Sequence, residues 1–410
     1  MKLQRRVVVT GLGLVSPLGN DVSSSWDACT KGISGISTFD NTINNSPVSI
    51  GGRIKDLDLS LYLDSKDTRR LDTFIQYGVV AASQAIADSG FLNYSTDLTR
   101  AGVNFGSGIG GIETIENNHK LYLEKGYKKV SPFMVPGSII NMISGHISIK
   151  FGLRGSNVST VTACSSGNHC IGSAARSIAY GESDVMVAGG SEMASTPLAI
   201  SGFIAARALS TSNNPITASR PWDIDRDGFV LSDGAGAIIL EDLEHAKKRK
   251  ANIYAEIIGF GMSSDAFHMT APPEDGQGAA LSMTNAINDA EININDVDYI
   301  NAHGTSTPLG DLAEATAMKS IFKDKVPAIS STKSMTGHTL GAAGAIESIF
   351  SILTIKNNTI PPTINLDNQD PRCQLDFTPH IARESEVNIA MNNSFGFGGT
   401  NSTLIFKKYI

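Results

Sequence analysis

One pattern occurs twice in this sequence, once in each half, and it limits the folds that the chain can adopt. In the first half an apolar run, 157–162, leads into a loop of small residues that carries Cys164. In the second half a similar run, 326–330, leads into a glycine-rich loop that carries His338. An alanine-rich helical segment follows each loop. This weak internal repeat, one of pattern and not of identity, predicts two similar α/β halves packed together.

Short apolar, β-branched runs alternate with longer helical patterns along the chain. The predicted strands are 7–10, 103–106, 157–162, 184–188, 253–259, 298–302 and 326–330. The predicted helices are 71–88, 136–151, 165–180, 311–322 and 341–353, and Gly90 and Gly152 stand where two of them should end. Because such apolar strands are typical of sheets that helices cover on both faces, we expect an α/β fold. We divide it into an N-terminal half, 1–251, and a C-terminal half, 252–410.

Composition and charge exclude several classes of protein. Charged residues make up 18% of the chain, below the usual share of about 25%, which indicates a compact body with much buried surface. The net charge of −7 argues against a nucleic-acid partner. The four cysteines show neither a disulfide framework nor zinc-type spacing. With no signal-peptide pattern and no apolar run of about 18 residues, we expect a cytoplasmic protein that does not insert into a membrane.

Cys164 stands where a strand is expected to become a helix, in the stretch "VTACSSGNHC". The thiolate is the reactive form of cysteine, and a helix N-terminus lowers a thiol pKa through its dipole and its free N–H groups. A strand-to-helix elbow also exposes a nucleophile, as in serine hydrolases. The alternative is a buried structural cysteine, the commoner fate of this residue type. The elbow alone makes Cys164 a candidate nucleophile and leaves both interpretations open.

Two histidines stand at the ends of predicted strands in the second half. His303 lies in "NAHGTSTPLGD", and His338 lies in "SSTKSMTGHTLGAAGA". Loops at the C-terminal ends of strands are where α/β folds place ligands and catalysis. One such histidine would carry little weight. Two histidines and one cysteine at equivalent strand ends favour a catalytic site.

Two glycine-rich stretches do not support nucleotide binding. "TGLGLVSPLG" has serine at the third glycine position of the dinucleotide fingerprint, and no acidic residue ends a second strand at the required distance. "GSGIGG", 106–111, is not followed by the Lys-Ser/Thr of a phosphate-binding loop, so a tight pocket wall is the better interpretation. No close group of His, Cys and Asp has metal-ligand spacing, and we expect no metal.

Five motifs together carry a resemblance to a known family. They are, in order, "TACSSGNHCIG", "RPWDIDRDGFVLSDGAGA", "NAHGTSTPLGD", "SSTKSMTGHTLGAAGA" and "NNSFGFGGTN". With these motifs, the chain from residue 7 to residue 408 resembles the β-ketoacyl-acyl-carrier-protein synthases, and most closely their elongating type II. The resemblance implies a thiolase-like fold, with duplicated α/β halves in five layers (α-β-α-β-α), and a homodimer.

The resemblance also implies an activity in fatty-acid biosynthesis and its catalytic residues. An acyl chain is transferred to Cys164, and decarboxylative condensation with a malonyl thioester gives a β-ketoacyl product two carbons longer. His303 and His338 complete the triad, since two histidines beside a cysteine mark the elongating type. Lys333 matches the active-site lysine of the family, with Glu314 as its expected partner.

Further matched residues are expected to shape the pocket. The backbone N–H groups of Cys164 and Phe397 would form an oxyanion hole. Phe397 would also act as a gate to an acyl pocket that Phe395, Ile109 and Met134 help to form. Ile109 fits the type II pattern, since type I enzymes tend to carry glycine there. Met134 stands where an aromatic residue is frequent at the subunit interface, so the preferred chain length stays open.

The substrates of this family arrive on the phosphopantetheine arm of an acyl-carrier protein. Thr305, Thr307, Thr270 and His268 match residues that line the path of this arm. Six cations match a basic rim that would dock the acidic carrier protein: Lys66, Arg69, Arg70, Lys128, Lys129 and Arg207. The resemblance implies no cofactor beyond the phosphopantetheine of the substrates. It allows a structural monovalent cation, whose ligands the sequence does not identify.

Three other functions are open at this point. A Cys-His hydrolase would not need two histidines at symmetric strand ends. A non-catalytic partner subunit that only sets chain length typically lacks the nucleophile, so Cys164 argues against it. A polyketide-type ketosynthase shares the fold and the triad and differs in its pocket lining.

Overall fold

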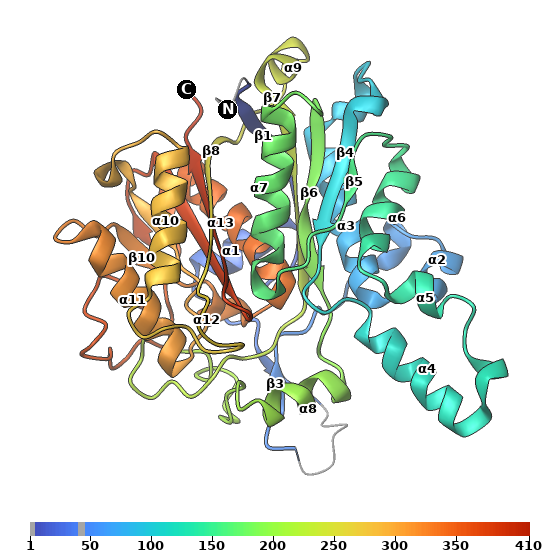
Figure 1. Cartoon of the computed structure of the whole chain (residues 1–410), viewed down its shortest axis with the longest axis horizontal. Helices are drawn as coiled ribbons and strands as arrows, with labels where there is room; N and C mark the ends of the chain where they lie inside the picture. The colour runs from blue at the N-terminus through green and yellow to red at the C-terminus, as the bar shows by residue number, and fades with distance from the viewer. Residues whose placement is uncertain (1–4, 40–45) are drawn as a thin grey trace.

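The computed structural model describes residues 5–39 and 46–410 (Figure 1). The strands of the first half are β1 (Val7–Val15), β2 (Ser37–Thr38), β3 (Ile50–Gly51), β4 (Ala101–Gly106), β5 (Asn157–Val158), β6 (Val185–Glu192) and β7 (Gly234–Asp242). Its helices are α1 (Val22–Thr30), α2 (Ser65–Arg70), α3 (Thr73–Ser89), α4 (Ile112–Lys125), α5 (Met134–Ser138), α6 (Asn141–Phe151), α7 (Ser166–Ala179), α8 (Pro197–Ala205) and α9 (Leu243–Lys248).

The second half repeats this alternation of strands and helices. Its strands are β8 (Ala255–Ser264), β9 (Tyr299–Asn301), β10 (Ala328–Ser330), β11 (Thr359–Ile360), β12 (Arg383–Glu384), β13 (Ile389–Gly396) and β14 (Thr400–Lys407). Its helices are α10 (Gln277–Asp289), α11 (Pro308–Phe322), α12 (Lys333–Thr336) and α13 (Ala343–Asn357). Among the described residues, none of these helices has both the length and the apolar character needed to span a bilayer.

The strand order of the first half recurs in the second half. The order β5-β4-β6-β7-β1 corresponds strand by strand to β10-β9-β13-β14-β8. The directions correspond as well, because β4 and β9 each pair in parallel with both neighbours, and the remaining pairings within each set are antiparallel. The duplication predicted from the repeated loop pattern is therefore confirmed.

The two sets of strands form one continuous sheet in the described part of the chain. β1 pairs with β8 in antiparallel fashion, residues 7–9 against 255–257, and this seam gives a sheet of 10 strands. The sequence predicted two similar halves but not this hydrogen-bonded seam between them.

Helices cover the outer faces of both sets of strands and fill the space between them, which gives the five layers. α3 and α6 pack on the first set, and α10 and α11 pack on the second (Figure 1). α7 and α13 lie in the central layer, where they contact strands of both halves. On β7, Ala237 and Ile239 face the α3 side, while Ile238 and Leu240 face the central layer. This is the two-residue period of a strand, so each face of β7 supports a different core.

Two predicted elements differ from the structure. The helix predicted at 136–151 is two helices, because the backbone becomes extended at Ile139, with φ −75° and ψ 137°. The strand predicted at 157–162 pairs only over its first two residues, and the Ser144 hydroxyl donates to the Val158 carbonyl at 2.7 Å.

The predicted helix ends are confirmed at both glycines. Gly90 follows α3 with φ 64°, and Gly152 follows α6 with φ 69°. This left-handed conformation is the one that glycine adopts most readily at a helix end.

Candidate active site

Cys164 lies at a sharp elbow between β5 and α7. Ala163 has φ 51°, a conformation that is uncommon for a residue with a side chain, and it turns the chain into the helix. The Thr162 N–H donates to the hydroxyl of Ser166, the first residue of α7, at 2.9 Å and closes the elbow. Cys164 itself is 8% exposed. The structure thus has the elbow that the sequence predicted, with its thiol held inside the protein.

His338 is the direct neighbour of this thiol. Its Nε2 atom lies 3.1 Å from the Cys164 sulfur. The His338 N–H donates to the Val230 carbonyl at 2.8 Å, and the Phe229 ring lies edge-on to the imidazole at a centroid distance of 5.2 Å. His338 belongs to the second half, and these contacts with residues of the first half hold its imidazole against the sulfur.

His303 completes a cluster of three reactive side chains. Its ring lies at 87° to the ring of His338, with the centroids 5.3 Å apart. Potential ligand atoms of Cys164, His303 and His338 all lie within 4.8 Å of one another. The structure therefore brings together the three residues that the sequence selected from separate strand ends.

Glu314, on α11, holds the backbone that carries His303. Its Oε1 accepts the His303 N–H at 2.9 Å, and its Oε2 accepts the Gly304 N–H at 2.8 Å. Glu314 is 2% exposed, and burial raises its pKa to about 7. The carboxylate holds the loop after β9 through these two hydrogen bonds, and the charge of Lys333 is a smaller influence that lowers the Glu314 pKa.

The ion pair of Lys333 differs from the one expected with Glu314. Lys333 begins α12, is 1% exposed, and forms its ion pair with Glu347 of α13. Burial raises the pKa of Glu347 to about 7, and the Lys333 ammonium opposes this shift. The carboxylate of Glu314 already accepts two backbone N–H groups. Glu347, on the central helix that follows the His338 loop, forms the ion pair with Lys333 instead.

Burial dominates the protonation of the cluster. It raises the pKa of the Cys164 thiol to about 11, although the Phe397 N–H and the Lys333 charge act in the opposite direction. The expectation of a lowered thiol pKa at the helix N-terminus is thus wrong, because desolvation outweighs the favourable contacts. Burial, and then Lys333, hold the pKa of His303 and of His338 well below the ordinary histidine value. Both imidazoles are neutral at pH 7.

Backbone N–H groups face the thiol from two sides. Hydrogen bonds from the N–H of Phe397 and from the N–H of Cys164 itself both lower the thiol pKa. Phe397 lies in the turn between β13 and β14 and is 37% exposed. A Cβ at Gly396 would lie 2.8 Å from the Thr162 carbonyl oxygen and 3.1 Å from the Cys164 nitrogen. Only glycine at position 396 lets this turn approach the elbow so closely.

A cavity of about 640 Å³ opens onto the cluster. Besides the three reactive side chains and Glu314, its wall includes most of the residues predicted for the pocket: Ile109, Arg207, His268, Thr270, Thr305, Thr307, Phe395 and Phe397. The Phe395 ring lies 5.8 Å from the ring of His303. Met134, partly buried at the start of α5, is not on this wall.

Polar groups gather along the entry to this cavity. The hydroxyls of Thr305 and Thr307 lie 3.0 Å apart. His268 Nδ1 accepts the N–H of Thr270 at 3.2 Å and the N–H of Ala271 at 3.3 Å. The structure thus places hydroxyl and imidazole groups on the path to the thiol.

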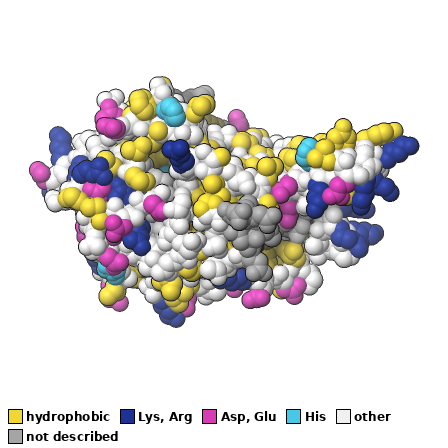
Figure 2. Space-filling view, turned by 90° about the horizontal axis from the view of Figure 1, so that it is seen from below, with side chains coloured by type: hydrophobic (Ala, Val, Ile, Leu, Met, Phe, Trp, Pro, Cys, Tyr) yellow, Lys and Arg dark blue, Asp and Glu magenta, His cyan; other side chains and the backbone are white. Residues whose placement is uncertain are grey.

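Of the six basic residues predicted to form a rim, only Arg207 lies on the cavity wall. Lys66, Arg69 and Arg70 are exposed on α2, and Lys128 and Lys129 are exposed in a turn after α4. Figure 2 shows Lys and Arg side chains gathered on the projecting arm at the right, where α4 lies in Figure 1. In one chain, therefore, these cations do not form a ring around the cavity.

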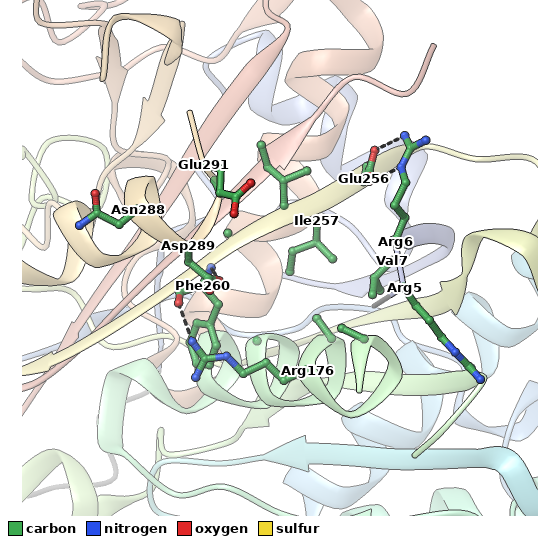
Figure 3. Close-up of a pocket in the computed structure, with 16 residues that line it drawn as sticks. Arg5, Arg6, Val7, Arg176, Glu256, Ile257, Phe260, Asn288, Asp289 and Glu291 are labelled. Carbon is green, nitrogen blue, oxygen red and sulfur yellow. Dashed lines mark hydrogen bonds and ion pairs between the residues drawn. The ribbon is translucent and has the colours of Figure 1, made fainter. Parts of the chain in front are cut away.

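A second cavity, of about 410 Å³, lies between α7, β8 and the end of α10 (Figure 3). Its cations already have partners. Arg6 pairs with Glu256 at 2.6 Å, Arg5 pairs with Asp184 at 2.7 Å, and Arg176 donates to the Phe260 carbonyl at 3.0 Å. The contacts of Arg6 and Arg176 join the two halves, whereas the pair of Arg5 and Asp184 lies within the first half. In the described part of the chain, these contacts leave no convergent reactive groups in this cavity.

Two buried glutamates beside the cluster were not predicted. They are Glu347 on α13 and Glu192 at the end of β6, with exposed fractions of 2% and 0%. The available signal was an acidic residue inside otherwise apolar stretches, "GAIESIF" and "VMVAGGSE". Because a glutamate is almost never fully buried without a partner, such a position calls for a specific contact.

A duplicated five-layer α/β fold that brings one cysteine and two histidines together in a cavity defines a thiolase-fold condensing enzyme. Residues 4–246 match the family model for the beta-ketoacyl synthase N-terminal domain, and residues 254–367 match that for the beta-ketoacyl synthase C-terminal domain. The chain belongs to the β-ketoacyl synthase family.

Curated relatives match over their full length. The chain is 55% identical over 411 residues to a 3-oxoacyl-[acyl-carrier-protein] synthase 2 of Coxiella burnetii, and 54% identical over 413 residues to that of Vibrio cholerae, with 99% of each chain covered. It is 47% identical to the Staphylococcus aureus protein of the same name, with 100% of both chains covered.

Solved structures show the same fold. A beta-ketoacyl synthase from Burkholderia phymatum superposes with a TM-score of 0.93 at 36% identity, over 99% of this chain and 100% of that one. A chain of a complex described as a type II PKS acyl-carrier protein with its ketosynthase, bound to the hexaketide, has a TM-score of 0.92 at 33% identity, with 99% and 100% covered.

Proposed function

We propose that this chain is an elongating β-ketoacyl-acyl-carrier-protein synthase of type II, an acyltransferase of fatty-acid biosynthesis. The observation that carries the proposal is the contact of 3.1 Å between His338 Nε2 and the Cys164 sulfur, with His303 beside it at the base of a cavity. Relatives named 3-oxoacyl-[acyl-carrier-protein] synthase 2, at 47–55% identity over the full chain, support it.

The first half-reaction loads the acyl chain onto Cys164. Since the thiol pKa is about 11, the neutral imidazole of His338 takes the proton as the sulfur attacks the thioester carbonyl. The N–H groups of Cys164 and Phe397 stabilise the resulting oxyanion. The carbonyl–sulfur bond of the donor then breaks, and the proton passes to the departing pantetheine sulfur. The acyl chain is left as a thioester of Cys164.

The second half-reaction extends the chain. A malonyl thioester loses CO2, and the electrons of the broken bond move into the thioester as an enolate. Neutral His303 and His338 donate hydrogen bonds to the enolate oxygen, each worth about 3 kcal/mol if losses at oxyanion holes are a guide. The enolate carbon attacks the acyl carbonyl, the bond to the Cys164 sulfur breaks, and the thiolate takes up a proton. Burial keeps both imidazoles neutral, and the charge of Lys333, which pairs with Glu347, acts in the same direction.

The entry path would hold the phosphopantetheine arm and the carrier protein. Thr305 and Thr307 offer hydroxyls to the arm, with Thr270 and His268 on the same wall, and Arg207 offers a charge to an acidic carrier at the mouth. The cations of α2 and of the turn after α4 would join this rim if a homodimer brings the arm of one subunit beside the cavity of the other. Met134 would then contribute at the subunit interface.

We place the reaction in the reducing cytoplasm, which would keep the four free, buried cysteines as thiols. No organic cofactor is proposed. The cluster of Cys164, His303 and His338 has spacing that could hold a metal ion, but the nearby Lys333 charge disfavours a divalent cation there.

A structural monovalent cation would need buried oxygens that no N–H or O–H group already occupies. In the described part of the chain, Glu347 Oε2 and Asn301 Oδ1 are buried oxygens without a hydrogen-bond partner, whereas both oxygens of Glu314 accept backbone N–H groups. No ligand set for a cation is proposed beyond this.

Intact-protein mass spectrometry tests the proposed function. The enzyme is mixed with a long-chain acyl-carrier protein and then with malonyl-carrier protein. We expect an acyl adduct on the wild type but not on Cys164→Ala, and its discharge as a β-keto product two carbons longer only when malonyl donor is added. No adduct would favour a non-catalytic partner subunit, and discharge by water alone would favour a hydrolase. Repeated extension without release of the product would favour a polyketide-type ketosynthase.

A further inference from the structure

Glu192, the last residue of β6, is a buried carboxylate that contacts hydrogen-bond donors at both oxygens. It accepts the Ser107 hydroxyl at 2.7 Å and the N–H groups of residues 108–110 at 2.6, 3.1 and 3.2 Å. It also accepts the N–H of Gly341, from the other half of the chain, at 3.0 Å. The side chain is 0% exposed. Five donors therefore converge on one carboxylate.

This set of contacts fits the ionised carboxylate. Each oxygen accepts at least two N–H or O–H groups, and a proton on either oxygen would face a donor instead of an acceptor. Burial raises the pKa of Glu192, but the Ser107 hydroxyl and the backbone N–H groups lower it. Hydrogen bonds from donors to an anion are about twice as strong as those between neutral groups.

The carboxylate joins three parts of the active site. Residues 107–110 follow β4 and carry Ile109, whose side chain lies on the cavity wall. Gly341 belongs to the turn that follows His338. A Cβ at Gly108 would lie 2.7 Å from Glu192 Oε2 and 3.3 Å from the carbonyl oxygen of Ala163, which precedes the nucleophile. Glu192 thus holds the loop 107–110 of the cavity wall and the turn after His338. Through Gly108, this loop packs against the elbow that carries Cys164.

We propose that Glu192 is a positioning residue that fixes the Ile109 segment of the cavity wall relative to Cys164 and His338, and that it thereby sets how strictly the enzyme discriminates between acyl chain lengths. This inference rests on the proposed function, because the discrimination requires that the cavity hold an acyl chain. Glu192 acts through the backbone N–H groups and touches no reacting atom. Its release would let the wall adapt to chains that it otherwise excludes.

The charge of Glu192 gives a second, independent readout. Besides burial, five groups act on Cys164, and of these Glu192 raises the thiol pKa. The others are His338 at 3.1 Å, Lys333 and the N–H groups of Phe397 and of Cys164 itself. Replacing the carboxylate by a neutral amide removes that effect. Alkylation of Cys164 by iodoacetamide should then reach a given rate at a lower pH than in the wild type.

Glu192→Gln is the direct test, because it keeps the shape but turns one acceptor into a donor that faces N–H groups. We expect the ratio of kcat/KM between the best acyl-carrier substrate and the next longer one to fall by about fivefold or more. Decarboxylation of malonyl-carrier protein should fall by a smaller factor than this ratio, since neither His303 nor His338 has a hydrogen bond to Glu192. The alkylation profile should shift to lower pH.

Glu241→Gln is the matched control. Glu241 is an equally buried strand glutamate on β7, paired with Arg249 at 2.7 Å, so its replacement lowers stability and should leave chain-length selectivity unchanged.

If Glu192→Gln does not fold, Ser107→Ala removes one donor to Glu192 and should lower selectivity in the same direction. The inference is overturned if the folded Glu192→Gln enzyme has the same chain-length selectivity as the wild type. If only Ser107→Ala can be studied, unchanged selectivity in that variant overturns it. A wild type that forms no acyl adduct overturns the proposed function instead.

Discussion

The Nε2 atom of His338 lies 3.1 Å from the sulfur of Cys164, whereas His303 approaches His338 through its ring and forms no hydrogen bond to the sulfur in the described part of the chain. The two histidines therefore differ in their relation to the nucleophile, although both are buried and neutral. Both line the cavity, but only His338 is placed to exchange a proton with the thiol.

This difference predicts separable effects of the two histidines. His303→Ala should still form the acyl adduct at Cys164 but should lose malonyl decarboxylation by about 10²–10³-fold, the cost of removing one oxyanion donor. His338→Ala should slow both steps, because it also removes the base beside the thiol. Single-turnover acylation and CO2 release, measured separately, check this. Equal loss of acylation in both variants would contradict the assignment.

The pKa of Cys164 predicts an unusual alkylation profile. Because burial raises this pKa to about 11, the thiolate fraction at pH 7 is small and grows as the pH rises. The rate of iodoacetamide modification should therefore keep increasing from pH 7 to pH 10. A plateau below pH 8 would show instead that the helix N-terminus dominates. The Cys164→Ala variant gives the rate at which iodoacetamide modifies the other three cysteines, which are all buried.

The sequence could predict the fold and the three reactive residues because both have local patterns. The repeated strand-loop-helix signal identified Cys164 and His338, and the strand order confirms the duplication. The partner of Lys333 could not be predicted in this way. Glu314 and Glu347 lie 19 and 14 residues away along the chain, and the choice between them depends on the packing of α13 in the central layer. The thiol pKa likewise depends on burial, which a local elbow pattern does not report.

The ion pair between Lys333 and Glu347 predicts strong energetic coupling. Glu347→Gln leaves a buried ammonium without its counter-charge, and such changes cost about 3–5 kcal/mol in the free energy of unfolding. In a Lys333→Met background the same substitution should cost far less, so a double-mutant cycle should give a coupling energy of at least about 1.5 kcal/mol.

Glu314→Gln is the control for this cycle. Its carboxylate accepts two backbone N–H groups, so the substitution should destabilise the protein by about 1–3 kcal/mol. Its coupling to Lys333 should be weaker than that of Glu347, because the Lys333 charge is a minor influence on the Glu314 pKa. Urea denaturation of the single and double variants measures both couplings. A stronger coupling of Lys333 to Glu314 than to Glu347 would restore the partner expected from the family resemblance.

Two glycines of the turn around Phe397 predict different defects. Gly398 has φ 85°, and a Cβ there would meet no atom within 4 Å, so Gly398→Ala costs about 1–2 kcal/mol of backbone strain and restricts the turn without a clash. In Gly398→Ala, steady-state turnover should fall several-fold, while the enzyme still forms an acyl adduct with a short chain. Gly396→Ala would push against the Cys164 nitrogen, at 3.1 Å, and should impair adduct formation itself. Rapid-quench measurement of the adduct separates the two, and equal defects would argue against a mobile gate.

Arg207 predicts how the carrier protein is recognised. It is exposed and lies on the wall of the active-site cavity, so Arg207→Glu should raise KM for carrier-bound substrate by about tenfold and leave KM for coenzyme A thioesters nearly unchanged. The matched control is Lys247→Glu on α9, at the opposite end of the molecule from α8 (Figure 1), which should affect neither substrate. Lys128→Glu and Arg69→Glu then test the rest of the rim. A selective effect on the carrier-bound substrate there would extend the docking surface beyond the cavity wall, which neither residue lines within one chain. Equal effects of Arg207→Glu on both substrates would show that this residue acts on the cavity and not on the carrier protein.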